Sequence, residues 1–346
     1  MRRAIQQYFV WPVLVTLAGL ALAIWLGWRQ GGAGGAISFG IIAVVLSVLE
    51  ISLSFDNAIV NANKLQTMAP IWRRRFLTWG ILIAVFGMRI VFPLAVVVVA
   101  AGIGPWQAVH LAATEPARYA VIIEEAHLSI TAFGGTFLMM VALGFFIDET
   151  KEVDWIGGLE RRLRRAAGVQ GLQIGLVMLV LVSFAAVLDP VDTGTFLFAA
   201  LLGLLSFLAL DMLGNWLDAE QEVAGAARVG GLGAFLYLEV LDASFSFDGV
   251  IGAFAVTKNL FLIAIGLGIG AMYVRSMTIM LVEKRTLAEF RYLEHGAFYS
   301  ILVLSVLMYL QAVVHVPEAM TGLLGAALIG VALWSSIRHK RAVENS

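Results

Sequence analysis

The sequence predicts an all-α polytopic membrane protein with about ten transmembrane helices. Hydrophobic residues make up 60% of the 346 positions and charged residues only 14%, whereas a soluble domain keeps about a quarter of its residues charged. The mean hydropathy is +0.90, and ten apolar runs follow one another along the chain. These observations exclude a soluble globule, a disordered chain and a coiled coil.

Each apolar run has about 20 residues, the length that a helix needs to cross the hydrocarbon core. The runs lie at about 8–27, 38–62, 76–103, 128–147, 172–189, 194–214, 233–256, 259–282, 293–314 and 317–337. The first run follows a basic N-terminus and resembles a signal peptide. However, its apolar part is too long, and the segment Trp-Arg-Gln at 28–30 is no small-residue cleavage site. We therefore expect a retained anchor helix.

Lys and Arg fall unevenly on the two sides of the predicted membrane. With the N-terminus inside, 18 of the 23 basic residues lie in inner segments and three in outer segments. Positive charge collects on cytoplasmic loops. We therefore expect both termini in the cytoplasm and the chain in a plasma (inner) membrane. The two remaining basic residues, Arg89 and Arg275, lie inside predicted spans.

Two further segments have distinctive composition. The charged segment 148–165 predicts a solvated cytoplasmic loop, and its basic run at 161–165 predicts a topology determinant that also contacts anionic lipid. In the eighth run, the small residues Ala264, Gly266, Gly268 and Gly270 predict close helix packing.

Acidic residues inside the predicted spans form a repeat. The second run reads Glu-Ile-Ser-Leu-Ser-Phe-Asp-Asn-Ala-Ile from position 50, and the seventh reads Asp-Ala-Ser-Phe-Ser-Phe-Asp-Gly-Val-Ile from position 242. An acid, two serines, a phenylalanine, an aspartate and an isoleucine recur at equal offsets. The span after each motif carries one arginine, Arg89 or Arg275, and the next span begins near an acid and a histidine.

Spans 2–4 and 7–9 therefore predict two copies of a three-helix unit. The basic residues send span 2 inward and span 7 outward, so the two copies have inverted topology, which is typical of secondary transporters with midplane sites. Within one integral membrane domain, 1–346, we expect an anchor at 1–37, the first repeat at 38–147, a cytoplasmic loop and connecting helices at 148–232, the second repeat at 233–314, and a last helix with a basic tail at 315–346.

Helix geometry separates the repeated acids. Six residues turn a straight helix through about 600°, so Glu50 and Asp56 point about 120° apart. Glu50, Ser54 and Asn57 share one face, whereas Ser52 shares another face with Asp56. One ion reaches both acids only if the helix unwinds near 55–57. Broken helices in transporters permit such unwinding, at 55–57 and at the matching segment 247–249, where a glycine favours it more than Asn57 does in the first copy.

Carboxylates, amide oxygens, hydroxyls and freed carbonyls are hard donors that suit Mg²⁺, Ca²⁺ or Mn²⁺. The acids and their neighbours in the two motifs, with a further acid one turn before the second motif, therefore predict a metal site. The predicted ligands are Glu50, Asp56, Asn57, Glu239, Asp242 and Asp248. Arg89 and Arg275 are predicted as counter-ions to these acids, or as internal cations that move between states.

The paired motifs and the arginines that follow them resemble the TerC family of integral membrane proteins, which is named for tellurite resistance. The resemblance covers about residues 38–315, and the run at 53–58 is its most specific part. It implies an exporter of Mn²⁺ or a related metal ion, with Glu50, Asp56, Asn57, Asp242 and Asp248 at the matching positions. The sequence departs from the family pattern in its loop 148–165 and in Glu124, Glu125, His127, Glu294 and His295.

The leading hypothesis is a secondary transporter that exports a divalent metal ion, with Mn²⁺ first, by ion exchange at the acidic sites. Two alternatives stay open: an intramembrane hydrolase that uses Asp56 and Asp248 as a carboxylate pair, and a membrane scaffold linked to metal or tellurite stress. The inverted symmetry favours transport, because an enzyme does not need to present its site to both sides.

Composition and motifs limit the other functions. The chain has no cysteine, which excludes disulfides and thiolate metal sites, and its net charge of −1 gives no indication of nucleic-acid binding. No phosphate-binding loop or hydrolase motif is present. We therefore expect no enzyme activity, no catalytic residue and no cofactor. The expected partners are the lipid bilayer and the transported metal ion, and a homo-oligomer is compatible with the sequence.

Overall fold

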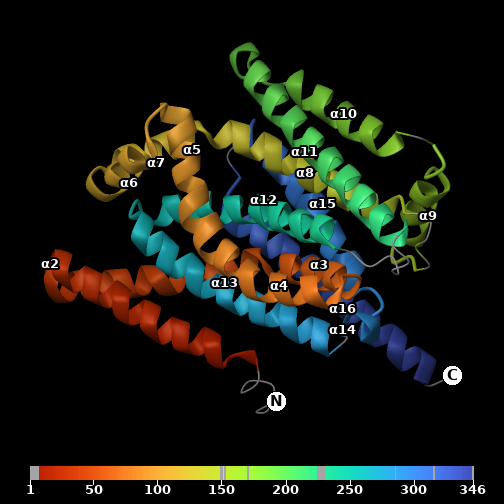
Figure 1. Cartoon of the computed structure of the whole chain (residues 1–346), viewed down its shortest axis with the longest axis horizontal. Coiled ribbons are helices and arrows are strands. Elements are labelled where there is room, and N and C mark those ends of the chain that lie inside the picture. The colour runs from red at the N-terminus through yellow and green to blue at the C-terminus, as the bar shows by residue number, and fades with distance from the viewer. Residues whose placement is uncertain are drawn as a thin grey trace.

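The computed structural model describes residues 8–148, 151, 153–169, 171–223, 231–284, 286–314 and 316–344, and these residues form helices and no strand (Figure 1). The chain order is α2 (Val10–Leu53), α3 (Phe55–Gln66), α4 (Pro70–Leu82), the π-helix η1 (Ile83–Val91), α5 (Phe92–Ala101), α6 (Pro105–Thr114), α7 (Pro116–Glu125), α8 (His127–Phe146), α9 (Gly157–Arg165), α10 (Leu172–Ala185), α11 (Pro190–Val223), α12 (Leu232–Val256), α13 (Leu260–Glu283), α14 (Thr286–Glu289), α15 (Leu293–Gln311) and α16 (Glu318–Glu344).

Six helices of the described chain are long and apolar enough to cross a bilayer, namely α2, α8, α11, α13, α15 and α16. A seventh crossing results if the bent pair Gly87–Ala101 and Pro105–Thr114 forms one span. The chain is therefore an α-helical polytopic membrane protein. Each of the ten predicted runs has a helical counterpart, but the number of ten crossings remains a prediction.

The long helix α2 is a hairpin of two antiparallel legs, 10–30 and 33–53. Gly32 has a left-handed backbone with φ +57°, and Gly31 beside it is also non-helical. The legs touch where Gly27 faces Gly35, because a Cβ atom on Gly27 would lie 2.2 Å from the carbonyl oxygen of Gly35. Figure 1 shows the two legs diverging from this turn. The hairpin accounts for the first two predicted runs.

Helix α13 packs closely against the second leg of α2. A Cβ atom on Gly266 would lie 2.5 Å from Cβ of Leu46, and one on Gly270 would lie 2.5 Å from Cβ of Glu50. The hydroxyl of Ser47 donates a hydrogen bond to the carbonyl of Gly266 at 3.0 Å. Small residues allow this approach between membrane helices, so the predicted close packing of the eighth run is confirmed.

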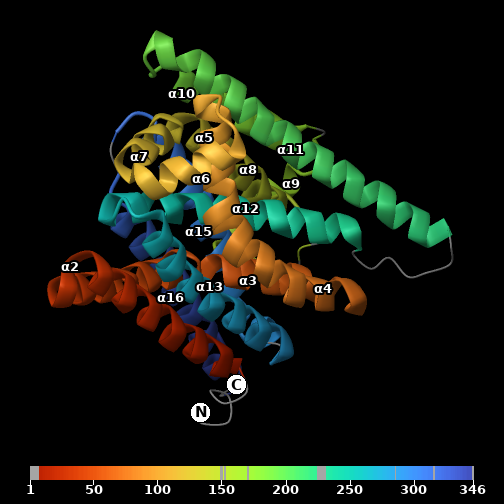
Figure 2. The same ribbon diagram turned by 60° about the vertical axis from the view of Figure 1, so that its left-hand side comes forward.

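The largest hydrophobic core surrounds α8, which packs between α11 and α15. Phe137 and Phe146 of α8 are buried there, and the hydroxyl of Tyr309 on α15 donates a hydrogen bond to Thr136 at 2.7 Å. Helices α10 and α11 lie side by side at one edge of the bundle (Figures 1 and 2).

The segment between α5 and α8 folds into two short helices. Gly102, with φ +62°, ends α5, and the chain bends by 105° into α6. Pro105 and Pro116 occupy the first positions of α6 and α7, where proline is well tolerated. The ring of Tyr119 lies 5.9 Å from that of Phe254, near the connection between α12 and α13. This end of the bundle therefore has a small core of its own.

Segments that the basic residues assign to one side of the membrane meet in the structure. The hydroxyl of Tyr8 donates to Glu283 at 2.8 Å, and Lys340 pairs with Glu289 at 2.9 Å. The first contact joins the start of α2 to the end of α13, and the second joins the end of α16 to α14. These contacts agree with the predicted alternation of the spans.

Much of the described part of segment 148–165 is exposed, but the segment contains the helix α9, and one of its acids is buried. Glu160 of α9 is only 1% exposed, and Lys151 pairs with it at 2.6 Å. His295 lies 3.4 Å from the same carboxylate, and the hydroxyl of Tyr299 donates to it at 3.1 Å. The prediction of a solvated loop is therefore wrong for Glu160, because α9 turns this acid toward the start of α15.

The carboxyl of Glu160 is held in its charged form. Burial raises its pKa, but hydrogen bonds from His295, Lys151 and the backbone N–H of Ile156 outweigh that effect, so the pKa falls below its ordinary value of 4.5. A group with a depressed folded-state pKa stabilises the fold above its unfolded pKa. That stabilisation is lost as the pH falls through the folded-state pKa.

The substitution Gly270→Ala is expected to lower the melting temperature in detergent. The new methyl group would overlap Glu50, and overpacking of this kind costs about 1–3 kcal/mol. Gly330→Ala on α16 is the matched control, because no atom lies within 4 Å of the added Cβ. Equal melting temperatures for the two variants would contradict the close contact between α2 and α13.

The substitution Glu160→Gln is expected to destabilise the protein at pH 7, because breaking a buried ion pair costs about 3–5 kcal/mol. The difference in melting temperature from the wild type should shrink as the pH falls below about 4.5. Glu289→Gln is the control, since that side chain and its partner Lys340 are about half exposed. A difference that stays constant from pH 7 to pH 3 would rule out the charged buried carboxylate.

Candidate cation site between the two acidic motifs

A small cavity lies where the two acidic motifs meet. Its volume is about 30 Å³, which is room for one dehydrated ion or one to two water molecules. The lining residues come from α2, α3, η1, α12 and α13, and they are Glu50, Ser54, Asn57, Asn61, Arg89, Asp242, Ser246, Ala271, Val274, Arg275 and Thr278. Five helices that are distant in sequence therefore converge on one polar point inside the bundle.

The first motif lies at a break between two helices. α2 ends at Leu53, α3 begins at Phe55, and Ser54 between them has φ −104° and ψ 15°. Backbone hydrogen bonds from Ser54 to Glu50 and from Ala58 to Ser54 bridge the break. The helices therefore bend without separating. The sequence predicts this break one residue further on, from position 55.

Four polar residues of this bent segment face the cavity. Glu50, Ser54, Asn57 and Asn61 lie four, three and four residues apart, which is the spacing of one helix face. The sequence predicts the shared face of the first three. Asn61 was not predicted as a site residue. Its position four residues after Asn57, within an apolar span, would have indicated it.

Glu50 is paired with Arg89 inside the bundle. A guanidinium N–H of Arg89 donates to Oε1 of Glu50, and the hydroxyl of Ser54 donates to the same oxygen at 2.9 Å. Glu50 is 1% exposed and Arg89 5% exposed. Arg89 lies on the π-helix η1, a wider turn that often occurs at functional sites.

Asp242 of the second motif is held by residues of the first. Nδ2 of Asn61 donates to Oδ1 of Asp242 at 2.7 Å, and Asn57 also reaches this carboxylate. Arg275 lines the same cavity and attracts Asp242 electrostatically. The two motifs, which lie 192 residues apart, therefore form one polar centre.

Three neutral oxygens at the cavity have no hydrogen-bond partner among the described residues. They are Oδ1 of Asn57, Oδ1 of Asn61 and Oγ of Ser246, and all three are buried. A buried polar atom without a partner costs about 1–3 kcal/mol. Together with the carboxylates of Glu50 and Asp242, these atoms form a set of hard donors that suits a cation.

Glu239 lies behind Arg275 and does not line the cavity. Its side chain is 8% exposed, and neither carboxylate oxygen has a hydrogen-bond partner within the described chain. Arg275 donates instead to the carbonyl oxygen of Phe76, and its guanidinium lies 4.4 Å from the centre of that ring. Glu239 and Arg275 still attract each other electrostatically.

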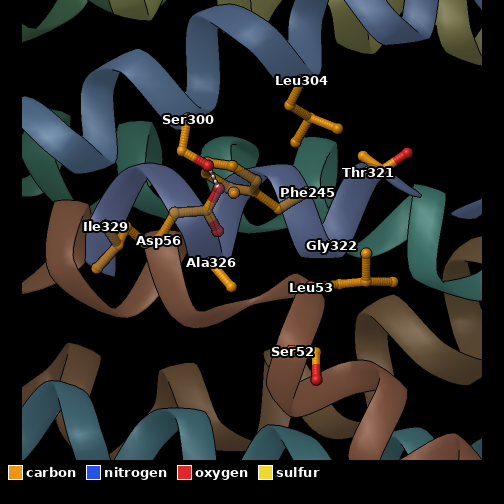
Figure 3. A pocket seen from close by; sticks show the side chains of 11 residues that line it. Ser52, Leu53, Asp56, Phe245, Ser300, Leu304, Thr321, Gly322, Ala326 and Ile329 are labelled. Atoms are coloured by element: carbon orange, nitrogen blue, oxygen red, sulfur yellow. Dashed lines mark hydrogen bonds between the residues drawn. The ribbon is translucent and has the colours of Figure 1, made fainter. Parts of the chain in front are cut away.

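Asp56 faces away from this cavity, toward α15 and α16. Figure 3 shows its carboxylate beside Ser300, whose hydroxyl donates to Oδ2 at 2.7 Å. Oδ1 accepts the backbone N–H of Asn57 at 2.8 Å. Ser52 lines the same separate cavity of about 10 Å³, as the predicted shared face requires. Because α3 continues the helix across the bend, Asp56 does not join Glu50.

The six predicted ligands therefore do not form one cluster. Glu50, Asn57 and Asp242 meet at the cavity, whereas Glu239 and Asp56 lie outside it. The side chain of Asp248 lies outside the described residues. Among the residues that the structure describes, no three His, Cys, Asp or Glu side chains converge as a metal site. A cation bound here would depend on amide and hydroxyl oxygens as well as carboxylates.

The second motif lies within an unbroken helix. α12 runs from Leu232 to Val256 without interruption, so the prediction of a break at 247–249 is wrong. Gly249 has a steric role instead, since a Cβ atom there would lie 3.1 Å from Oε2 of Glu50. The glycine makes room for the carboxylate and does not unwind the helix.

Comparison with known proteins gives a single finding. The family model described as "Protein of unknown function (DUF475)" matches residues 55–343, which include α3 and all later helices of the site. No similar curated protein and no similar solved structure is found.

Proposed function

We propose a transport function for this chain, which belongs to the DUF475 family, a family of proteins of unknown function. In this proposal the chain is a secondary transporter that exports a divalent cation, with Mn²⁺ as the first candidate. The cation binds in the cavity between the two acidic motifs. Its exchange for a proton or another ion moving in the opposite direction across the membrane drives transport. The resemblance to the TerC family supports both the metal and the direction.

The observation that carries the proposal is the set of unpartnered oxygens at the cavity. Asn57 and Asn61 direct their amide nitrogens at Asp242 and leave their amide oxygens unpaired. Burying polar groups in hydrocarbon is unfavourable in free energy, and such groups often mark ion pathways. Oxygen donors from carboxylates, amides and a hydroxyl suit Mn²⁺, Mg²⁺ or Ca²⁺ better than a soft metal.

The two arginines act as resident cations of the empty site. Arg89 neutralises Glu50, and Arg275 lies near Asp242 and Glu239. An arriving divalent cation competes with these guanidinium groups for the same carboxylates. The guanidinium groups therefore neutralise the carboxylates when no metal ion is bound, and a metal ion has to displace them in order to bind.

Helix packing supports the inverted repeat on which this mechanism relies. The first helix of each predicted repeat packs against the second and third helices of the other: α3 contacts α13 and α15, while α12 contacts η1 and α8. This reciprocal arrangement is expected of two similar units related by a pseudo-two-fold axis. Such an axis gives a central site two equivalent routes of access.

The hydrolase alternative has less support. It requires space for a substrate at the carboxylate of Asp56, whereas the cavity beside Asp56 has a volume of only about 10 Å³, which is room for about one water molecule. The scaffold alternative differs from transport in one measurable respect, because a scaffold moves no ion.

The variants Glu50→Gln and Asp242→Asn are expected to lower Mn²⁺ flux in sealed proteoliposomes across a pH gradient by about tenfold or more. Each removes one carboxylate charge at nearly constant volume, and a loss of about 1.4 kcal/mol in cation stabilisation already gives a tenfold effect. Glu289→Gln, which neutralises an exposed acid distant from the cavity, is the control and should transport as the wild type does.

Flux is measured with Mn²⁺ and then with Ca²⁺, Mg²⁺ and Zn²⁺, after size-exclusion chromatography shows that each variant is intact. Wild-type flux equal to that of empty liposomes for all four ions would contradict a divalent-cation transporter. Equal flux in the wild type and both cavity variants would place the transport site elsewhere.

A further inference from the structure

An open groove of about 400 Å³ lies between the start of α2 and the last turns of α13. Tyr8 and Trp11 form one wall, and α13 forms the other with residues spaced along one helix face, from Met272 through Arg275 and Ser276 to Glu283. Residues three and four apart on a helix lie on the same side. The groove therefore runs along α13 from its C-terminal end toward the middle of the helix.

Arg275 lines both this groove and the central cavity. On the cavity side its neighbours along α13 are Val274 and Thr278, and on the groove side they are Met272 and Ser276. The guanidinium group extends to the carbonyl of Phe76 on α4. It therefore separates the two spaces.

The charges along the groove favour water and cations over lipid. A carboxylate, Glu283, lies at the outer end, and a guanidinium, Arg275, lies at the inner end. Ionisable side chains at membrane depth face water-filled space or a partner. The outer carboxylate attracts cations into the groove, and the inner guanidinium repels them from the cavity.

Glu239 offers the Arg275 side chain an alternative hydrogen-bond acceptor. Glu239 is buried, attracts Arg275 and has two carboxylate oxygens without a hydrogen-bond partner in the described chain. A shift of the guanidinium from the carbonyl of Phe76 to Glu239 would satisfy those oxygens.

We propose that this groove is the route by which a cation reaches the central cavity, and that Arg275 is its gate. The proposal rests on the proposed transport function for its purpose, but it concerns water access, which can be measured without transport. Glu239 is then a positioning residue for the open gate. This accounts for a buried acid that does not line the cation site.

The chain contains no cysteine, so a single introduced cysteine reports access by its reaction with a membrane-impermeant, positively charged thiol reagent. Ser276→Cys is expected to react when the reagent is applied on the side of Tyr8 and Glu283, and not from the other side. Gln66→Cys and Val191→Cys, at exposed positions at opposite ends of the bundle, identify the two sides. Ser305→Cys, at a fully buried position, is the unreactive control.

The gate is tested with Thr278→Cys, whose position is 1% exposed at the cavity. We expect slow modification when Arg275 is present and an increase of about tenfold or more with Arg275→Ala, from the same side. Arg275→Gln serves as the second gate variant if Arg275→Ala fails to insert. Unreactive Ser276→Cys, or a Thr278→Cys rate that is independent of Arg275, would overturn the proposal.

The outcomes separate this proposal from the transport function. Expected labelling with no ion flux would retain the groove and its gate and reject transport. Ion flux with no labelling of Ser276→Cys would retain transport and reject this route.

Discussion

The structure depends on the pairing of the Glu50 carboxylate inside an apolar bundle. An isolated charge in hydrocarbon is costly, and the surrounding helices are shaped around this one. The π-helix η1 presents Arg89 to it, and Ser54 at the helix break donates a second hydrogen bond. Gly270 and Gly249 leave the space that the side chain occupies, since a Cβ atom on either would contact it. The same ion pair therefore accounts for three features of the fold, namely the close packing of α13 on α2, the bend before α3 and the path of α12.

The second half of the site follows from the repeat. Asp242 occupies the position of Glu50 in the second motif, and it is bound by Asn61 of the first. Each motif therefore supplies an acid, and the first also supplies amides that reach across to the second. The result is a cavity with two carboxylates, two arginines and three unpaired neutral oxygens within the described chain. A cation entering this centre would satisfy the oxygens and replace the arginines, which is the physical basis of the proposed exchange.

Sequence patterns predicted the parts of this arrangement that depend on local spacing. The helical runs, the small face of α13 and the shared face of Glu50, Ser54 and Asn57 follow from helix periodicity and are found in the structure. Sequence patterns did not predict the features that depend on contacts between distant helices. A helix break was expected at Gly249, but its missing side chain instead makes room for Glu50. Glu50 and Asp56 were both predicted as metal ligands, but the helix does not unwind between them, and Asp56 contacts Ser300 instead. Glu160 was expected in solvent because its segment is charged, but it also contacts His295 and Tyr299 of the distant helix α15.

In the proposed function, the cavity between the two motifs binds a divalent cation through Glu50, Asp242 and the neighbouring amide oxygens. Anomalous X-ray scattering from crystals grown with Mn²⁺ tests it directly. We expect one anomalous peak in the cavity, within coordinating distance of both carboxylates, with Arg89 or Arg275 moved away from its acid. Full Mn²⁺ occupancy at another position, with an empty cavity and the Glu50–Arg89 pair intact, would contradict it.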